Sequence, residues 1–285
     1  MSNVLNLVDQ SVEKIPLQWY CHIVEGGNNL SSESFDVPGL NGYLLSVPYK
    51  DAKQGGDIHY ITVCNHGAYS KFLILDVSGH GEDAGQISKQ LYQPLFDLLD
   101  ERDNNKILEK LNEIMISLNL GGKFATVVVA TYNRYFCSWT FSYAGHPPML
   151  HFQNNSWQSI KSSGSAPIGI VDNIEFQQST IFLQPGDRIL LFSDALTEIK
   201  LKNNKRLDET GLLKTLSSLA PNNIGTYFKE LIQALIKLNQ GEQFSDDLTF
   251  ILLEHNPKLA ARISLKLSKI FLPKKLIIKL CTLPK

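Results

Sequence analysis

The chain has 285 residues, of which 43% are hydrophobic and 19% are charged, and its formal net charge is −1 at pH 7. This apolar content is enough to bury a substantial core, which excludes a disordered or fibrous chain. The net charge hides an asymmetry, because residues 255–285 contain eight Lys or Arg and no Asp or Glu. The remainder carries 19 basic residues (27 less these eight) against 28 acidic ones, a net charge of −9. We therefore expect an acidic body with a basic tail.

The four cysteines lie far apart in the chain and form no Cys-x-x-Cys pair, which indicates neither a disulfide framework nor a zinc site. Residues 1–20 contain Asp9 and Glu13 and no apolar block, which argues against a secretory signal. No stretch reaches the ~18–20 apolar residues that a membrane span needs. These observations predict a cytoplasmic protein.

The first half of the chain is predicted to pass from a loop to strands and then to helices. Residues 26–39 are turn-rich by composition. Three short β-type runs follow, at 43–47, 58–63 and 72–75. Apolar residues then recur at helical spacing over 83–100 and 107–118. Pro94 should kink or restart the first helix, and Asn104 or Asn105 should cap the second.

The second half returns to strands. Residues 124–132 and 135–143 have the Val, Thr and aromatic content of strands and are joined at Asn133-Arg134, which predicts a β-hairpin. Further β-type runs occupy 149–152, 180–183, 188–192 and 248–253, and helical patterns occupy 208–219 and 224–238. Because strands cluster with strands and helices with helices, the pattern predicts the α+β class with antiparallel sheets.

No composition shift before residue 255 indicates a domain boundary. We therefore expect an N-terminal segment over 1–40 that is partly loop, one folded domain over 41–254 and a basic tail over 255–285. The first 40 residues are too few for a sensor domain of common size.

Acidic residues stand where predicted strands begin or end. Asp57 precedes one β-type run and Asp76 ends the next; Asp194 follows a third, and Asp246 and Asp247 precede the last. Carboxylates on stiff strand ends can converge on the rim of a sheet, where they repel one another unless a cation neutralises them. Oxygen ligands favour Mg²⁺ or Mn²⁺. A single Asp at a strand end is usually a turn or solubility residue, so a metal site and ordinary turns both remain open interpretations.

A second interpretation concerns residues 76–84. Gly79, Gly81 and Ala84 match a Gly-x-Gly-x-x-[Gly/Ala] dinucleotide-binding turn between a strand and a helix. Two acidic residues, Glu82 and Asp83, would however stand at the helix start and repel the pyrophosphate. A second helix, and not the strand of a βαβ unit, follows. The pattern therefore disfavours nucleotide binding.

A series of motifs resembles the metal-dependent protein phosphatases (protein phosphatase 2C, PPM), and most closely their bacterial sporulation and stress-response branch, which is stage II sporulation protein E-like. The motifs occur in the family's order over about residues 50–254. They are Gly55-Gly56-Asp57, Asp76-Val77-Ser78-Gly79-His80-Gly81, Phe124-Ala125-Thr126, Ser142-Tyr143-Ala144-Gly145-His146-Pro147-Pro148, Pro167-Ile168-Gly169, Pro185-Gly186-Asp187-Arg188, Ser193-Asp194 and Asp246-Asp247-Leu248-Thr249. The resemblance implies two packed antiparallel β-sheets flanked by helices, an αββα sandwich.

The same resemblance implies two Mn²⁺ or Mg²⁺ ions at one edge of the sheets. Carried over by position, the implied ligands are Asp57, Asp76, the backbone carbonyl of Val77, Asp194 and Asp246. Asp76 is expected to bridge the ions, and Asp247 is a weaker candidate because the family often has Asn at that position. Two divalent ions lower the pKa of water and neutralise charge during attack on phosphorus.

The implied activity is hydrolysis of phosphoserine and phosphothreonine in a regulatory protein, such as an anti-sigma-factor antagonist. An alternative function is that of a catalytically impaired relative that binds a phosphoprotein, because Ala195 replaces the family's usual Gly. If that backbone needed a positive φ, Ala would strain it by roughly 1 kcal/mol.

No catalytic residue beyond metal-activated water, and no phosphate-binding residue, can be assigned. His80 is a weak candidate for a general acid, since Ser78 stands where eukaryotic members place a His. His146 is expected to shape a turn. Arg134 and Arg188 are phosphate-contacting candidates only by elimination, and surface salt bridges are the simpler interpretation of both.

The basic tail has an amphipathic pattern. Its apolar residues recur from Leu259 to Ile270 at helical intervals, and a parallel row of Lys and Arg repeats beside them before Pro273. Such a helix lies on an anionic membrane surface or docks on an acidic partner. Residues 258–285 are therefore predicted either to make peripheral membrane or partner contact or to pack on the chain's own acidic body.

Overall fold

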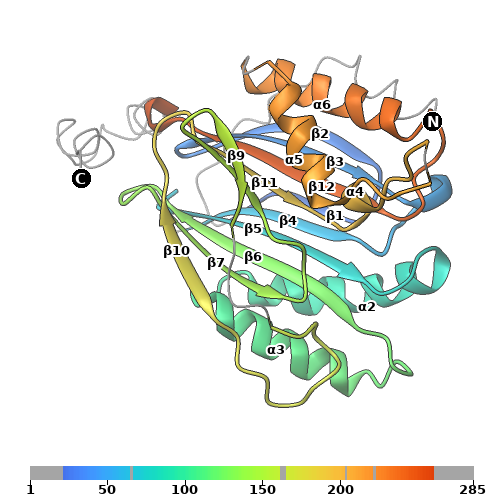
Figure 1. Cartoon of the computed structure of the whole chain (residues 1–285). Coiled ribbons are helices and arrows are strands. Elements are labelled where there is room, and N and C mark those ends of the chain that lie inside the picture. The colour runs from blue at the N-terminus through green and yellow to red at the C-terminus, as the bar shows by residue number, and fades with distance from the viewer. Residues whose placement is uncertain (1–21, 65–66, 161–164, 203, 221–222, 260–285) are drawn as a thin grey trace.

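A computed structural model describes residues 22–64, 67–160, 165–202, 204–220 and 223–259. Two six-stranded sheets face each other, and every pair of neighbouring strands in them is antiparallel (Figure 1). Helices cover the outer face of each sheet, so the predicted αββα sandwich is confirmed.

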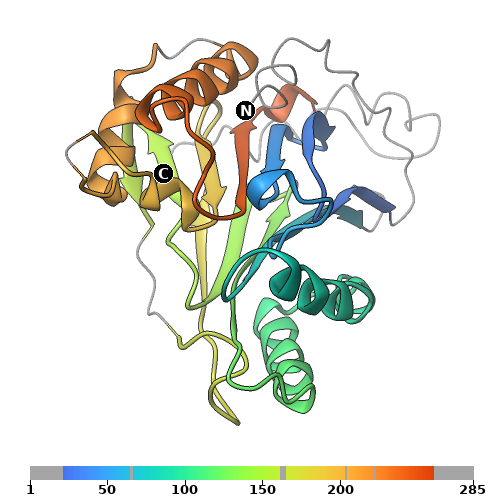
Figure 2. The same ribbon diagram turned by 90° about the vertical axis from the view of Figure 1, so that its right-hand side faces the viewer.

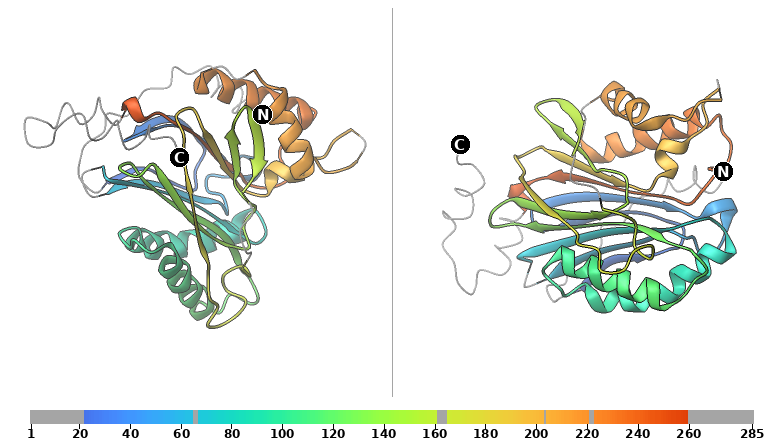
Figure 3. Two further views of the ribbon diagram at one scale, coloured as in Figure 1. Left: turned by 60° about the vertical axis from the view of Figure 1, so that its left-hand side comes forward. Right: turned by 60° about the horizontal axis from the view of Figure 1, so that its bottom comes forward.

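The first sheet has the strand order β1-β4-β5-β6-β7-β10. Its strands are β1 (His22–Gly27), β4 (Ile58–Cys64), β5 (Tyr69–Val77), β6 (Ala125–Asn133), β7 (Ser138–Ala144) and β10 (Gln178–Phe182). Two helices, α2 (Glu82–Leu98) and α3 (Asn104–Ser117), lie across its outer face (Figure 3).

The second sheet has the strand order β2-β3-β12-β11-β8-β9. Its strands are β2 (Ser31–Val37), β3 (Leu40–Val47), β12 (Leu248–His255), β11 (Arg188–Phe192), β8 (Leu150–Gln153) and β9 (Ser156–Ser159). Its outer face is covered by α4 (Ala195–Glu198), α5 (Asp208–Ser218) and α6 (Ile224–Leu238). A short 3₁₀ helix, η1 (Tyr49–Asp51), leads from β3 toward β4.

The central strands are apolar on both faces because each sheet lies between two layers. On β5, Phe72 and Ile74 face the other sheet, whereas Leu73 and Leu75 pack under α2 and α3. Successive side chains of the strand thus pack in different cores, one between the two sheets and one under the helices. This double burial explains why the sequence shows continuous apolar runs where a sheet with one wet face would show alternation.

Several local predictions were wrong. The segment 26–39 is not mainly loop: it contains β2, an edge strand with a polar serine-rich sequence that pairs with β3, so the sandwich begins ahead of the boundary expected at residue 41. An edge strand needs only a few buried side chains, here including Phe35 and Val37, and composition alone conceals it. The β6–β7 turn is also longer than predicted and spans 134–137.

The helix signals were partly misread. α2 runs through Pro94 to Leu98 without restarting. The cap of α3 is Asp103, whose carboxylate accepts a hydrogen bond from the Asn105 amide at 3.0 Å, one residue before the predicted capping position. None of the helices in the described ranges is both long and apolar enough to cross a membrane. The predicted amphipathic pattern of the tail falls almost entirely outside the described residues, which end at 259.

Strand pairing brings the candidate residues to one end of the sandwich. The start of β4 pairs with the end of β5, since Ile58 lies opposite Leu75. In the second sheet the end of β11 lies beside the start of β12, where Phe192 pairs with Phe250. Figure 2 looks onto this end, where η1, the start of α2 and the first residues of β12 lie together.

Candidate metal centre

Asp57 is the most deeply buried of the predicted carboxylate ligands. It is 2% exposed, and both of its carboxylate oxygens are buried without a hydrogen-bond partner among the described residues. Burial, followed by the charges of Asp76 and Asp247, holds its pKa well above the ordinary range, although the nearby Ser193 and Thr249 hydroxyls act in the opposite direction. A charged Asp57 in this position needs a cation.

Asp76 stands at the centre of the acidic group. Burial raises its pKa well above the ordinary value, and so do carboxylates that come from the second sheet and the helix after it. In order of effect these are Asp194, Asp246, Asp247 and Glu198. Asp76 belongs to the last residues of β5. The first sheet therefore places this carboxylate close to the negative charges that the second sheet carries.

Asp194 and Asp246 are only partly buried. Burial raises the pKa of Asp246 to about 6; the Asp247 backbone amide counteracts this effect, and the charges of Asp247 and Asp194 add to it. Burial and then the charge of Glu198 raise the pKa of Asp194. Each of these carboxylates is therefore destabilised in its charged form by burial and by its acidic neighbours.

Asp247 has a different environment. Its Oδ1 accepts a hydrogen bond from the Tyr49 amide at 2.7 Å, and its Oδ2 accepts one from the Gly56 amide at 2.8 Å. A Cβ on Gly55 would collide with Oδ1 of Asp247. Asp247 thus ties the η1–β4 loop to β12. The close contact explains why Gly55 and Gly56, which have no side chains, precede Asp57.

The Val77 carbonyl lies beside the same loop. A Cβ on Gly56 would stand 3.5 Å from the Val77 oxygen and 3.0 Å from Cβ of Ala84. The close approach of these backbones needs glycine at this position. It brings a carbonyl oxygen of β5 toward the segment that carries Asp57.

The donor set fits Mn²⁺ or Mg²⁺. All of its atoms are oxygens, one carboxylate is buried without a partner, and the group is mutually repulsive. Within the described ranges, no three Asp, Glu, His or Cys side chains are gathered into a ready-made metal cage. Ions of the Mg²⁺ kind keep several waters and take few direct carboxylate ligands, so a loosely spaced acidic group suits them.

Two charged residues near this end were missed by sequence reasoning. Glu198 on α4 follows Asp194 by four residues, the spacing that places helical neighbours on one face, and it contacts Arg206. Lys123 directly precedes the Phe124-Ala125-Thr126 motif, and its Nζ donates to the Ser78 carbonyl at 3.2 Å. Lys123 therefore holds the loop that leaves β5 after Asp76.

The two candidate histidines differ in setting. His80 is exposed and its ring lies 4.2 Å from that of Tyr49, centroid to centroid; a positive charge on it lowers the pKa of Asp246. His146 is buried, and a 2.8 Å hydrogen bond joins its Nδ1 to the Thr126 hydroxyl. Burial lowers the pKa of His146 to about 3, so it is neutral and serves to fasten the turn after β7 to β6.

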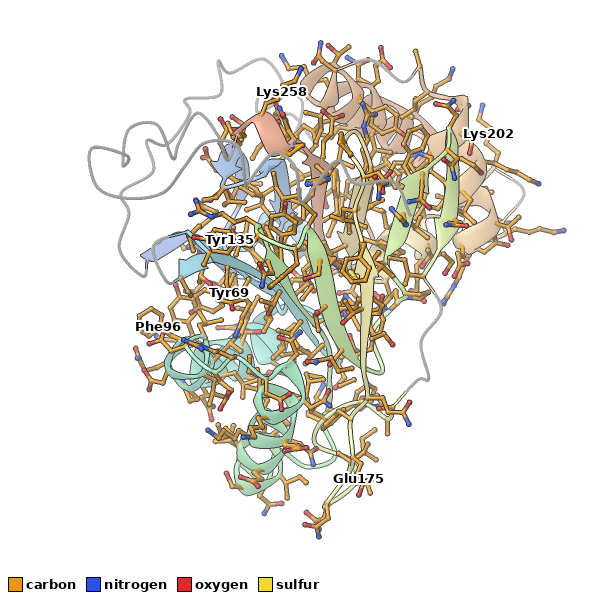
Figure 4. The ribbon with its side chains drawn as sticks, turned by 90° about the vertical axis from the view of Figure 1, so that its left-hand side faces the viewer. Tyr69, Phe96, Tyr135, Glu175, Lys202 and Lys258 are labelled. Atoms are coloured by element: carbon orange, nitrogen blue, oxygen red, sulfur yellow. The ribbon has the colours of Figure 1, made fainter. Side chains whose placement is uncertain are left out.

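The two candidate arginines lie at the opposite end of the sandwich. Arg188 opens β11 and pairs with Glu254 at 2.8 Å, whereas Asp194 follows the other end of that strand. Arg134 lies in the β6–β7 turn beside Tyr135, and Figure 4 labels Tyr135 near Tyr69, the first residue of β5. Asp76 lies near the other end of that strand. Both arginines are buried, so neither lies on the surface as expected; Arg188 nevertheless forms an ion pair, with the partly exposed Glu254.

Ala195 occupies an unstrained position. It begins α4, and it is absent from the non-glycine residues with positive φ in the described chain. The Asp194 carbonyl accepts the amides of Thr197 and Glu198 at 2.9 and 3.0 Å, as in a regular first turn. The substitution of Gly by Ala therefore costs no backbone strain here.

Known proteins share extended sequence similarity with this chain. A family model described as stage II sporulation protein E (SpoIIE) matches residues 67–256. The chain is 27% identical over 213 residues to phosphoserine phosphatase RsbU of Bacillus subtilis (strain 168), an alignment that covers 73% of this chain and 61% of RsbU. The chain thus spans about three-fifths of that relative's length.

Solved structures share the fold. The RsbU and RsbW domains of Rv1364c from Mycobacterium tuberculosis superpose with a TM-score of 0.67 at 22% identity, over 80% of this chain and 63% of that one. The PP2C phosphatase domain of SpoIIE from Bacillus subtilis, with a fragment of its regulatory domain, gives 0.65 at 17% identity, over 75% and 63% of the two chains.

Proposed function

This chain belongs to the stage II sporulation protein E (SpoIIE) family, and from that premise we propose that it is a Mn²⁺- or Mg²⁺-dependent phosphatase acting on phosphoserine and phosphothreonine in proteins. The observation that carries the proposal is the buried carboxylate of Asp57, which has no hydrogen-bond partner in the described part of the chain and lies within a group of mutually repelling carboxylates from both sheets. Such an arrangement is costly unless the group holds cations.

In this proposal the residues divide their tasks. The carboxylates of Asp57, Asp76, Asp194 and Asp246 and the Val77 carbonyl would hold the ions. Asp76 would be central to the group, because its charge raises the pKa of Asp57 and the carboxylates of the second sheet and α4 raise its own. Divalent ions held here supply the Lewis-acid and water-activating chemistry of phosphate-ester hydrolysis. Asp247 orients the loop before β4, and Lys123 and Ser78 hold the loop after β5.

The proposed substrate is a phosphorylated regulatory protein, for example an anti-sigma-factor antagonist. RsbU, to which the chain is similar, is named a phosphoserine phosphatase, which supports phosphoserine as the reacting group. His80 remains a weak candidate for a proton donor, supported by its position beside Tyr49 and its electrostatic effect on Asp246.

An inactive, phosphoprotein-binding relative is the second candidate function. The sequence reason for it was Ala195, and the unstrained helical backbone at this residue removes that reason. The complete set of acidic residues favours the enzyme.

The decisive measurement is release of phosphate from a phosphoserine peptide and from an aryl phosphate with and without Mn²⁺. We expect turnover only with the metal, and a loss of at least about 10²-fold in Asp76→Asn and Asp194→Asn, because each removes a charge that stabilises the ions. Asp100→Asn, an exposed carboxylate near the end of α2, is the matched control and should keep full activity. Wild-type protein that binds Mn²⁺ without turnover would support the binding-module function instead.

We also propose that the basic residues of 258–285 bring the enzyme to an anionic membrane or an acidic partner. The support is the charge pattern, eight cations without an acidic residue over 255–285. Full-length protein should sediment with anionic vesicles and a 1–256 truncation should not. Equal sedimentation of the two proteins would show that the tail does not recruit the enzyme to a membrane.

A further inference from the structure

A pocket of about 410 Å³ lies beside the candidate metal centre, between the loop after η1 and the first two turns of α2. The loop contributes Ala52, Lys53 and Gln54, and the helix contributes Glu82, Gly85, Gln86 and Lys89. Helix and loop are in close contact, because a Cβ on Gly85 would stand 3.2 Å from the Gln54 carbonyl oxygen. Because Gly85 has no side chain, the helix can lie this close to the loop without filling the pocket.

Both walls of the pocket continue into the metal centre. The loop wall runs directly into Gly55, Gly56 and Asp57, and the Ser88 hydroxyl of α2 donates to the Gly56 carbonyl at 2.5 Å. The helix wall begins immediately after the loop that leaves Asp76. When the phosphorylated residue of a peptide lies at the metals, the side chain of a neighbouring peptide residue can therefore reach this pocket.

The pocket is lined by more cationic than anionic side chains, with two lysines against one glutamate. Lys53 and Lys89 are exposed, and neither forms an ion pair within the described ranges. Gln54 and Gln86 add amide donors, and Glu82 is the single carboxylate of the lining. No large apolar side chain lines it, so the pocket suits a small anionic group and not an apolar one.

We propose that this pocket binds a carboxylate side chain of the protein substrate, next to the phosphorylated serine or threonine. The inference rests on the proposed function and specifies its substrate as a phosphoprotein with acidic residues flanking the phosphorylated position. Outside the tail the chain has a net charge of −9, which repels such a segment, so two unpaired lysines at the approach to the metals provide local compensation.

The test uses the full-length protein with Mn²⁺ and compares two phosphoserine peptides that differ only by Glu→Gln changes at the flanking positions. We expect wild type to prefer the acidic peptide and Lys53→Gln/Lys89→Gln to lose about 3- to 10-fold in kcat/KM on it, the scale of two exposed charge pairs. The variant should keep wild-type kcat/KM on the neutral peptide and on an aryl phosphate.

Two matched variants separate local from global charge. Lys53→Arg/Lys89→Arg keeps the charge and should keep the preference. Lys214→Gln/Lys229→Gln removes two exposed lysines from α5 and α6, on the other sheet, and should also keep it. No preference in wild type, or an equal preference in Lys53→Gln/Lys89→Gln, overturns the proposal.

Two further measurements test whether the pocket binds phosphate instead, and whether it binds the acidic peptide when the protein has no activity. Inorganic phosphate should inhibit wild type and Lys53→Gln/Lys89→Gln equally; weaker inhibition of the variant would mean that the pocket takes phosphate, against the proposal. If wild type hydrolyses neither peptide nor aryl phosphate, the proposed function fails. Binding of a labelled acidic peptide, measured by fluorescence anisotropy, then still tests the proposed role of the pocket. Tighter binding by wild type than by the variant supports it, and equal binding overturns it.

Discussion

At the scale of single residues, the defining feature is a carboxylate buried without a partner. Among the described residues the carboxylate oxygens of Asp57 have no hydrogen-bond partner. The nearby Ser193 and Thr249 hydroxyls offset its burial only in part, and the charges that act on it are of the same sign. Burial and like charge both favour the protonated form, which accounts for the raised pKa values of Asp57, Asp76, Asp194 and Asp246. In the absence of metal, the site should therefore weaken the fold that carries it.

The pH dependence of the metal-free protein tests this. Between the ordinary carboxyl pKa and the raised folded value, a window that for Asp246 runs from 3.8 to about 6, the folded state binds more protons than the unfolded state, so stability falls as pH rises. Asp57→Asn removes one of these charges and should raise the Tm of metal-free protein at pH 7, by about 2–4 °C for each kcal/mol regained.

Two comparisons check the assignment. The gain in Tm should shrink as pH falls toward 4, where wild type is protonated too. Added Mn²⁺ should raise the Tm of wild type more than that of Asp57→Asn, since only ions that bind the folded state stabilise it. The exposed control Asp100→Asn should follow wild type in both measurements. A Tm gain that is the same at pH 4 and pH 7 would contradict the electrostatic account.

At the scale of elements, one side chain joins the loop of one sheet to a strand of the other. Asp247 at the start of β12 accepts the amides of Tyr49 and Gly56 and so sets the path of the chain into β4. The two residues before Asp57 are glycines, and a Cβ on either of them would lie too close to the Asp247 carboxylate. The position of Asp57 is thus decided by a contact between residues almost two hundred positions apart.

A double-mutant cycle should reveal this contact. Gly55→Ala places a methyl group against Oδ1 of Asp247 and should cost about 1–3 kcal/mol of stability, with weaker Mn²⁺ binding. In an Asp247→Ala background the obstacle is absent, so the added cost of Gly55→Ala should be smaller. Thermal unfolding and Mn²⁺ titration of the four proteins measure both quantities. Equal costs in the two backgrounds would refute the steric role of Asp247.

At the scale of the whole molecule, the sandwich separates the candidate metal ligands from the Arg188–Glu254 ion pair. The carboxylates gather where β5 and β11 end, whereas Arg188 and Glu254 pair at the other end of β11 and β12. The Arg188 guanidinium also lies 4.7 Å from the centre of the Tyr227 ring on α6. This arginine fastens a helix to the second sheet, and it lies at the end of β11 opposite to the one that Asp194 follows.

Arg188→Met should therefore change stability and leave kinetics alone. We expect unfolding to become easier by about 2–3 kcal/mol, less than a fully buried pair costs, because the Glu254 side chain is 23% exposed and regains water. The KM for a phosphoserine peptide should stay at the wild-type value. Denaturant unfolding and steady-state kinetics check the two halves, and a raised KM with unchanged stability would place Arg188 in the site.

Most of the strands, their antiparallel class and the chain order of the acidic positions were predictable from sequence, whereas β1, β2 and β9 were not predicted. Apolar runs report burial directly, and Asp57, Asp76, Asp194 and Asp246 all adjoin such runs. The edge strand β2 was not predictable, because a strand at the rim of a sheet needs few apolar residues. Lys123, Glu198 and the lysines of the pocket were missed because isolated surface charges carry no periodic signal.

The sequence by itself determined that a phosphatase-like series of carboxylates lies on strand ends, and that a net charge of −1 combines an acidic body with a basic tail. Only the tertiary structure decided which charges share a space. It placed Arg134 and Arg188 away from the carboxylates, tied the Asp57 loop to β12 through Asp247 and set Lys53 and Lys89 beside the candidate metal centre. Local patterns report burial and backbone preference, whereas electrostatic neighbours depend on strand order and register across two sheets.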